Sequence, residues 1–84
     1  MKYYVYILES EKTGTYYKGI TYNLENRLIE HNAGEMKSTK AYRPWRLIGY
    51  LEKPNKSEAL ILEKKLKHLS RKRLEEFIEK YCVR

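Results

Sequence analysis

One carboxylate sits among apolar residues in this sequence. Glu63 lies in a stretch with helical periodicity, and on a helical projection it falls between the directions of Ala59 and Leu60. Leu66 points nearly the same way. Burying a carboxylate is costly unless something binds it. A divalent cation, Mg²⁺ or Mn²⁺, would be a suitable partner because such ions prefer oxygen ligands. A salt bridge to Lys67, one turn later, would serve equally well, so both explanations stay open.

Two tyrosines could bring hydroxyl groups to the same place. Tyr6 lies in residues 3–9 and Tyr17 in residues 15–21, and both stretches are rich in the aromatic and β-branched residues typical of strands. The turn-forming residues 11–14 between them predict an antiparallel hairpin. With the strands in register, both phenols would project toward one site. Ordinary cross-strand aromatic packing, which is common, is the other explanation and the one that the pattern alone favours.

Arginine and histidine share one face of the next predicted element. Asn23 is a suitable N-cap for a helix over residues 24–32, which Gly34 would end. Arg27 and His31 are four residues apart, so they lie on the same side of this helix. The planar guanidinium could grip a phosphate. A solvated helix face is the alternative.

Basic residues gather in the segment that follows. Residues 35–44 are polar and predict a loop that carries Lys37, Lys40 and Arg43. Together with Lys67 on a later helix, these cations could contact nucleic-acid phosphates independently of base sequence. They could equally be solvated surface groups.

The remaining elements complete an α+β pattern. A strand is predicted over residues 45–51. A helix capped by Ser57 should then run to about residue 68, and a last helix capped by Ser70 to about residue 80. The order is β-β-α-β-α-α.

The first strand should be covered on both sides. Val5 and Ile7 share one face, while Tyr4, Tyr6 and Leu8 share the other. Apolar side chains on both faces predict a sheet buried on each side.

Length and composition restrict the class of protein. Eighty-four residues make a single domain, 1–84. The net charge of +7, from 18 basic and 11 acidic residues, favours a polyanionic partner, although a merely soluble basic protein would also show it.

Cys82 is the only cysteine, which excludes an internal disulfide and a cysteine-based zinc site. The apolar run at the start is too short for a signal peptide or a membrane span, so we expect a cytoplasmic protein.

Taken together, these features resemble the GIY-YIG nuclease family, over roughly residues 3–70. The chain is most similar to the small members that consist of little beyond the catalytic module. No single element is specific, but five in order at the right spacing are. The matching elements are the triplets Tyr4-Val5-Tyr6 and Tyr17-Lys18-Gly19, residues 21–28 ending near Arg27, His31 to Gly34, Pro44-Trp45, and the helix from Glu58 to Glu63.

The resemblance implies a three-stranded antiparallel sheet flanked by helices. It also implies hydrolysis of a phosphodiester in nucleic acid, with DNA the expected class, by a water near one divalent ion, Mg²⁺ or Mn²⁺. Glu63 would hold the metal, and Arg27 would stabilise charge on the phosphate. Tyr17 would be the general base, and Tyr6 would orient the water or the base. His31 would contact the phosphate or assist proton transfer.

The sequence departs from the family pattern at the two triplets. Tyr4 replaces the glycine of the first, and Lys18 replaces the isoleucine of the second. Gly19 is kept, and we expect it to let a substrate or the neighbouring backbone approach closely. Ile20 stands where the excision-repair members carry a lysine.

Two other functions compete with a nuclease. One is a non-catalytic nucleic-acid-binding module that uses the same basic face. The other is a protein-interaction adaptor, which would have no physical need for Tyr17, Arg27 and Glu63 together. Many family members carry a separate targeting domain, and this sequence has none. We therefore expect weak intrinsic affinity and a need for a targeting protein or self-association.

Overall fold

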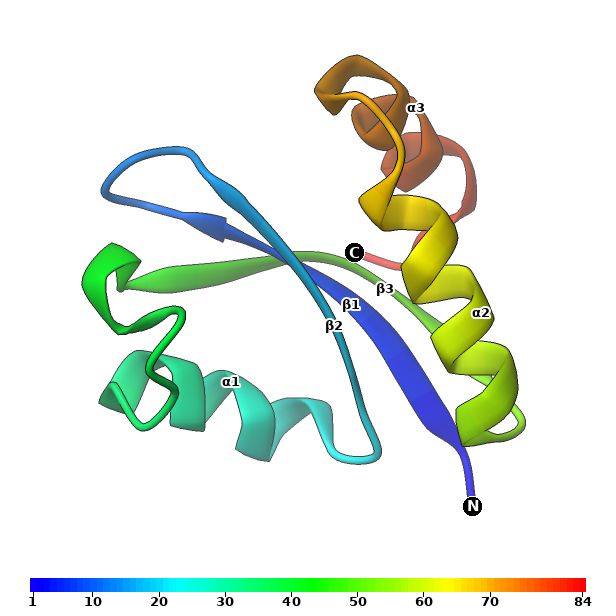
Figure 1. Cartoon of the computed structure of the whole chain (residues 1–84), viewed down its shortest axis with the longest axis horizontal. Coiled ribbons are helices and arrows are strands. Elements are labelled where there is room, and N and C mark those ends of the chain that lie inside the picture. Colours follow the sequence, from blue (N-terminus) through cyan, green and yellow to red (C-terminus); the bar gives the residue numbers. More distant parts are fainter.

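The computed structural model describes all 84 residues and places helices on both faces of a three-stranded antiparallel sheet (Figure 1). The sheet order is β2-β1-β3, so β1 is the central strand. This confirms the expected fold class and the order β-β-α-β-α-α. The elements are β1 (Tyr3–Ser10), β2 (Tyr16–Thr21), α1 (Leu24–Ala33), the 3-10 turn η1 (Lys40–Tyr42), β3 (Trp45–Lys53), α2 (Lys56–Lys67) and α3 (Arg71–Tyr81).

One face of the sheet is apolar. Val5 and Ile7 of β1 point toward α2 and α3, which lie together on this side in Figure 1. Four further buried side chains complete the cluster, namely Ala59, Leu66, Leu74 and Ile78. We call this side the apolar face. It contributes hydrocarbon burial, the main favourable term in folding.

The opposite face is aromatic. Tyr6 and Leu8 of β1 are buried there with Trp45, which begins β3. Helix α1 covers this side, and its Leu24 and Leu28 pack against the cluster. We call this side the aromatic face. The predicted burial of β1 on both sides is therefore confirmed.

Capping residues set the ends of α1. The Asn23 side chain accepts a hydrogen bond from the backbone N–H of Asn26 at 3.0 Å. At the other end, Gly34 adopts the left-handed conformation with φ 79°, which glycine tolerates without strain. Both ends were predicted from the sequence. The Ser70 cap of α3 is also confirmed, because its hydroxyl accepts from the N–H of Arg73.

The predicted cap of α2 is wrong. Asn55, not Ser57, caps this helix, and its side chain accepts from the N–H of Glu58 at 2.9 Å. Asn55 has the extended backbone that an N-cap needs, whereas Ser57 already lies within the first turn.

Strand β3 is longer than expected. It was predicted to end at residue 51 but continues to Lys53, because Tyr3 and Tyr4 of β1 pair with Lys53 and Glu52. None of the helices is long and apolar enough to cross a membrane.

Candidate active site

Strand register brings Tyr6 and Tyr17 to the same face. Tyr6 pairs with Gly19, and Leu8 pairs with Tyr17, so the two tyrosines are diagonal neighbours. Their ring centroids lie 6.3 Å apart. The expected role of Gly19 needs correction. The phenol ring of Tyr6 fills the space above it, since a Cβ at position 19 would lie 2.5 Å from the Tyr6 hydroxyl oxygen.

A buried chain of hydrogen bonds runs from Tyr6 into the basic loop. The Tyr6 hydroxyl lies 2.9 Å from Nε2 of His31, and Nδ1 of His31 lies 2.8 Å from the Thr39 hydroxyl. The Thr39 hydroxyl donates to the carbonyl of Met36, so it accepts from Nδ1–H. Nε2 is then left to accept from Tyr6. His31 is 0% exposed and both its nitrogens have partners, so it cannot contact a phosphate directly.

Burial keeps both groups of this pair neutral at neutral pH. Burial first, and then the nearby Tyr17 hydroxyl, raise the pKa of Tyr6 to about 12, although Arg27 acts in the opposite direction. Burial also lowers the pKa of His31, and the nearby Arg27 charge adds to this effect. The Tyr6 phenol therefore donates to an uncharged imidazole.

Tyr17 differs from Tyr6 in having a free hydroxyl. Its ring packs 5.0 Å from the His31 ring and 6.2 Å from that of Trp45, measured between centroids. The aromatic packing considered from the sequence is therefore present for both Tyr6 and Tyr17. However, the Tyr17 hydroxyl has no hydrogen-bond partner in the protein. Every buried side-chain polar atom does have one, so the Tyr17 hydroxyl must be open to solvent. It remains available to a water or a substrate.

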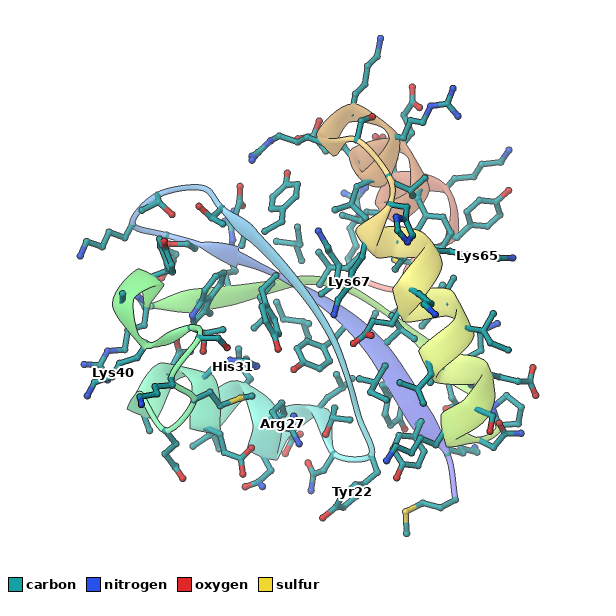
Figure 2. All side chains as sticks on the ribbon, in the orientation of Figure 1. Tyr22, Arg27, His31, Lys40, Lys65 and Lys67 are labelled. Atoms are coloured by element: carbon teal, nitrogen blue, oxygen red, sulfur yellow. The ribbon has the colours of Figure 1, made fainter.

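Arg27 approaches Tyr6 from α1. Its Nε pairs with the Glu30 carboxylate at 2.9 Å, and its side chain is 31% exposed. This ion pair fixes the base of the guanidinium and leaves its two outer nitrogens for another acceptor. In Figure 2, Arg27 on α1 and Lys67 on α2 lie on either side of β2.

Glu63 reaches the same region from α2. Its side chain is 17% exposed, and one of its oxygens lies 3.5 Å from Nζ of Lys67, so the salt bridge considered from the sequence is present. Its charge also acts on the Tyr6 hydroxyl, whose pKa it raises.

The donor set suits a loosely held hard cation. No group of three or more histidine, cysteine or carboxylate side chains is assembled anywhere in the chain. Mg²⁺ often binds through one or two carboxylates and takes its other ligands from water and substrate phosphates. Glu63 alone fits that pattern, with its second oxygen unpaired.

The structure gathers three of the four predicted nucleic-acid contacts. Lys37, Lys40 and Arg43 line one pocket of about 460 Å³, and Lys12 from the β1–β2 turn joins them. Lys67 lies apart from this pocket and pairs with Glu63. Figure 2 shows Lys40 and Lys67 at separate places on the molecule.

Several residues that organise the site were missed from the sequence. Thr39 orients His31, and Asn32 clamps the start of β3 by accepting from the N–H of Trp45 at 2.6 Å and donating to its carbonyl at 3.1 Å. Nothing in the sequence indicates that Lys12 lies beside the loop over residues 35–44. These contacts join residues that no local sequence pattern connects. The only sequence signal for any of them was that Asn32 directly follows His31, which was already a candidate site residue.

Comparison with known proteins identifies the family. The profile described as the GIY-YIG catalytic domain matches residues 2–77. The chain is 39% identical over 79 residues to the UPF0213 protein BH0048 of Halalkalibacterium halodurans, covering 93% of this chain and 83% of that protein. It is 45% identical over 73 residues to a UPF0213 protein of Syntrophus aciditrophicus, covering 83% and 82%.

A solved structure agrees with these matches. The solution NMR structure of the UPF0213 protein BH0048 from Bacillus halodurans aligns with a TM-score of 0.63 at 36% identity. The alignment covers 96% of this chain and 86% of that one. The fold, the family profile and these relatives agree, and the chain belongs to the GIY-YIG family.

Proposed function

We propose that this protein is a divalent-metal-dependent endonuclease that hydrolyses phosphodiester bonds in nucleic acid, with DNA as the expected class. One observation carries the proposal. Tyr6 and Tyr17 lie on one face of the sheet with ring centroids 6.3 Å apart, and the charges of Arg27 from α1 and Glu63 from α2 both act on the Tyr6 hydroxyl, which supports a shared site. Groups with these chemistries at one place suit phosphoryl transfer to water.

Each side chain has a distinct role. Arg27 binds the non-bridging oxygens of the scissile phosphate with its outer nitrogens and stabilises the charge that develops there. Tyr17 uses its free hydroxyl to orient the attacking water and receive its proton. Tyr6 stays protonated and positions these groups, while His31 orients the Tyr6 hydroxyl by accepting its hydrogen bond. Glu63 would hold Mg²⁺ or Mn²⁺.

Proton acceptance by a tyrosine requires positive charge nearby. An ordinary phenol has a pKa of about 10 and is protonated at neutral pH. Cations favour the phenolate form. Arg27 is one such cation, and a metal ion on Glu63 would supply further positive charge to the phosphate and the attacking water.

The direct test compares wild type with Glu63→Gln in nicking of supercoiled plasmid and of branched oligonucleotides, with Mg²⁺ or Mn²⁺. We expect Glu63→Gln to lose about 10²–10³-fold in rate, the size typical of one lost electrostatic contact to the transition state. The fold should survive because Gln has nearly the same shape. Glu76→Gln on α3 removes the same charge from an exposed position and should cleave normally. Unaltered cleavage by Glu63→Gln would exclude the metal role.

A second function is a nucleic-acid-binding module without catalysis. The pocket lined by Lys12, Lys37, Lys40 and Arg43 favours it, because these cations lie away from Lys67, the ion-pair partner of Glu63, and could act alone. Such a module would bind nucleic acid with an affinity that falls steeply with salt, and wild type would not cleave under any metal condition. Glu63→Gln would then change nothing.

A further inference from the structure

The basic pocket has the features of a site for one particular phosphate. We propose that Lys12, Lys37, Lys40 and Arg43 form a subsite for a single backbone phosphate of the nucleic-acid substrate, remote from the phosphate that is cleaved. The inference rests on the proposed function in taking nucleic acid as the ligand. The substrate would then contact the protein at two phosphates, the one that is cleaved and the one in this pocket.

Uncompensated charge is the first argument. The four side chains line a pocket of about 460 Å³. None of them takes part in an ion pair or donates a side-chain hydrogen bond. Five other basic residues pair with carboxylates, and the nine remaining ones outside the pocket are unpaired too, so what distinguishes these four is that they gather around one hollow. Four unpaired cations around one hollow make a strong local positive potential that an anion would neutralise.

Buried Ser10 builds the pocket from two distant segments. Its hydroxyl donates to the carbonyl of Tyr42 and accepts from the backbone N–H groups of Lys12 and Thr13, both at 3.1 Å. Ser10 is 2% exposed, so water does not compete for these bonds. The turn that carries Lys12 is thus fixed against η1, which carries Lys40. The backbone segments that carry Lys12 and Lys40 are therefore held next to each other by the fold.

Gly34 makes room for the arginine of the pocket. The guanidinium of Arg43 lies directly over Gly34, and a Cβ there would overlap Nη1 of Arg43. This packing restricts the side chain before any ligand binds. A preorganised fork loses less entropy on binding a phosphate than a free one.

The pocket is also tied to the candidate active site. Thr39 lies between Lys37 and Lys40 in the chain, and its hydroxyl holds His31. Its carbonyl accepts from Nε1–H of Trp45 at 2.9 Å. A phosphate in the pocket would therefore sit at a fixed position relative to Tyr6 and Arg27. Only a ligand with several linked phosphates can occupy both places, which favours a polynucleotide over a mononucleotide.

The test uses amide NMR titrations of the full chain without metal, so that no cleavage occurs. The ligands are inorganic phosphate and a short thymidine oligonucleotide. We expect the amides of residues 11–14 and 37–43 to shift with both. The variant Lys12→Gln/Lys40→Gln should lose these shifts, and the slope of its oligonucleotide affinity against salt should fall by about 1 per lost phosphate contact. Lys65→Gln/Lys72→Gln makes the same charge change elsewhere and should keep the shifts.

A second measurement locates the phosphate. Each phosphate of the oligonucleotide is replaced in turn by an uncharged methylphosphonate. Wild type should lose affinity at one position beyond the cleaved bond, and Lys12→Gln/Lys40→Gln should lose nothing further there. Equal oligonucleotide binding by this variant and the lysine control would overturn the subsite, as would pocket shifts with inorganic phosphate alone. Pocket binding by a protein that never cleaves would keep the subsite and refute the nuclease.

Discussion

The two faces of β1 are built in different ways. On the apolar face, Val5 and Ile7 lie in a cluster whose buried members are all hydrocarbon side chains. On the aromatic face, Tyr6 is equally buried, but its hydroxyl starts the chain of hydrogen bonds through His31 and Thr39. One strand therefore supports two layers of different chemistry, because its side chains alternate between the faces.

This difference separates stability from chemistry. Side chains on the apolar face need only the right volume, and volume-conserving changes there are generally tolerated. On the aromatic face each buried polar atom needs its partner, since an unsatisfied one is costly. A change to a buried hydrocarbon side chain on the apolar face should mainly affect the free energy of unfolding, whereas a change on the aromatic face, or at Glu63 of α2, should also affect the reaction.

The largest effect on stability is expected from Leu66→Ala on the apolar face. Leu66 is 1% exposed, and its truncation leaves a cavity that should cost about 2–5 kcal/mol in the free energy of unfolding. Chemical denaturation measures this loss. Leu60→Ala on the same helix is the control, because Leu60 is 45% exposed. Cleavage by the folded fraction should be unchanged, and a selective loss of cleavage would break the division between the faces.

Arg27→Lys should have the reverse profile. Lysine keeps the charge but loses the planar fork, so we expect about a 10²-fold fall in cleavage rate, or about 2.7 kcal/mol in the barrier. Stability should change little, because Arg27 is partly exposed. Arg46→Lys, at an exposed arginine paired with Glu9, is the control. Normal cleavage by Arg27→Lys would show that charge alone suffices.

Two glycines allow a matched comparison across the sheet. Alanine at Gly19 would place a Cβ 2.5 Å from the Tyr6 hydroxyl, so we expect a loss of about 1–3 kcal/mol in stability and a displaced Tyr6 ring. Alanine at Gly49 meets Cys82 and Ile78 at 3.0 and 3.1 Å, so it should cost less.

Cleavage distinguishes the two variants. Only Gly19→Ala should reduce it, and the NMR signals of the His31 ring should shift in the same variant. Equal cleavage by both glycine variants would mean that the position of Tyr6 is unimportant.

The smallest effect is a pH dependence from His31. Its pKa is lowered by burial, so the unfolded chain binds a proton more readily than the folded one. Stability should therefore fall as the pH drops below about 6.5, the ordinary histidine pKa, toward the lower folded value. Denaturation at a series of pH values should show this fall in wild type and in His68→Gln. His31→Gln should flatten it, and an unchanged slope would argue against a buried neutral imidazole.

Local signals explain how much of the fold was predictable. Asn23, Gly34 and Ser70 act within a few residues of their own positions, and their roles were predicted correctly. The cap of α2 was missed because Asn55 and Ser57 are both good caps, two residues apart, and only the backbone conformation distinguishes them.

The site was predictable to a similar extent. Two-residue alternation was enough to bring Tyr6 and Tyr17 together. The contact of Thr39 with His31, and the union of Lys12 with Lys40, depend on how a loop folds back, which no periodicity records. The metal role of Glu63 stays a prediction, because the Lys67 pair accounts for its charge equally well.

The two bonds between Asn32 and the backbone of Trp45 have a consequence for how this family could diversify. They hold the end of α1 to the start of β3, so the two ends of the loop over residues 35–44 stay together whatever its length. Closing a longer loop costs little extra entropy. Residues 35–44 could therefore change in length and sequence during evolution, and with them the substrate preference, while the sheet stays unchanged. Thr39 would limit such changes, because any replacement must still offer His31 an acceptor.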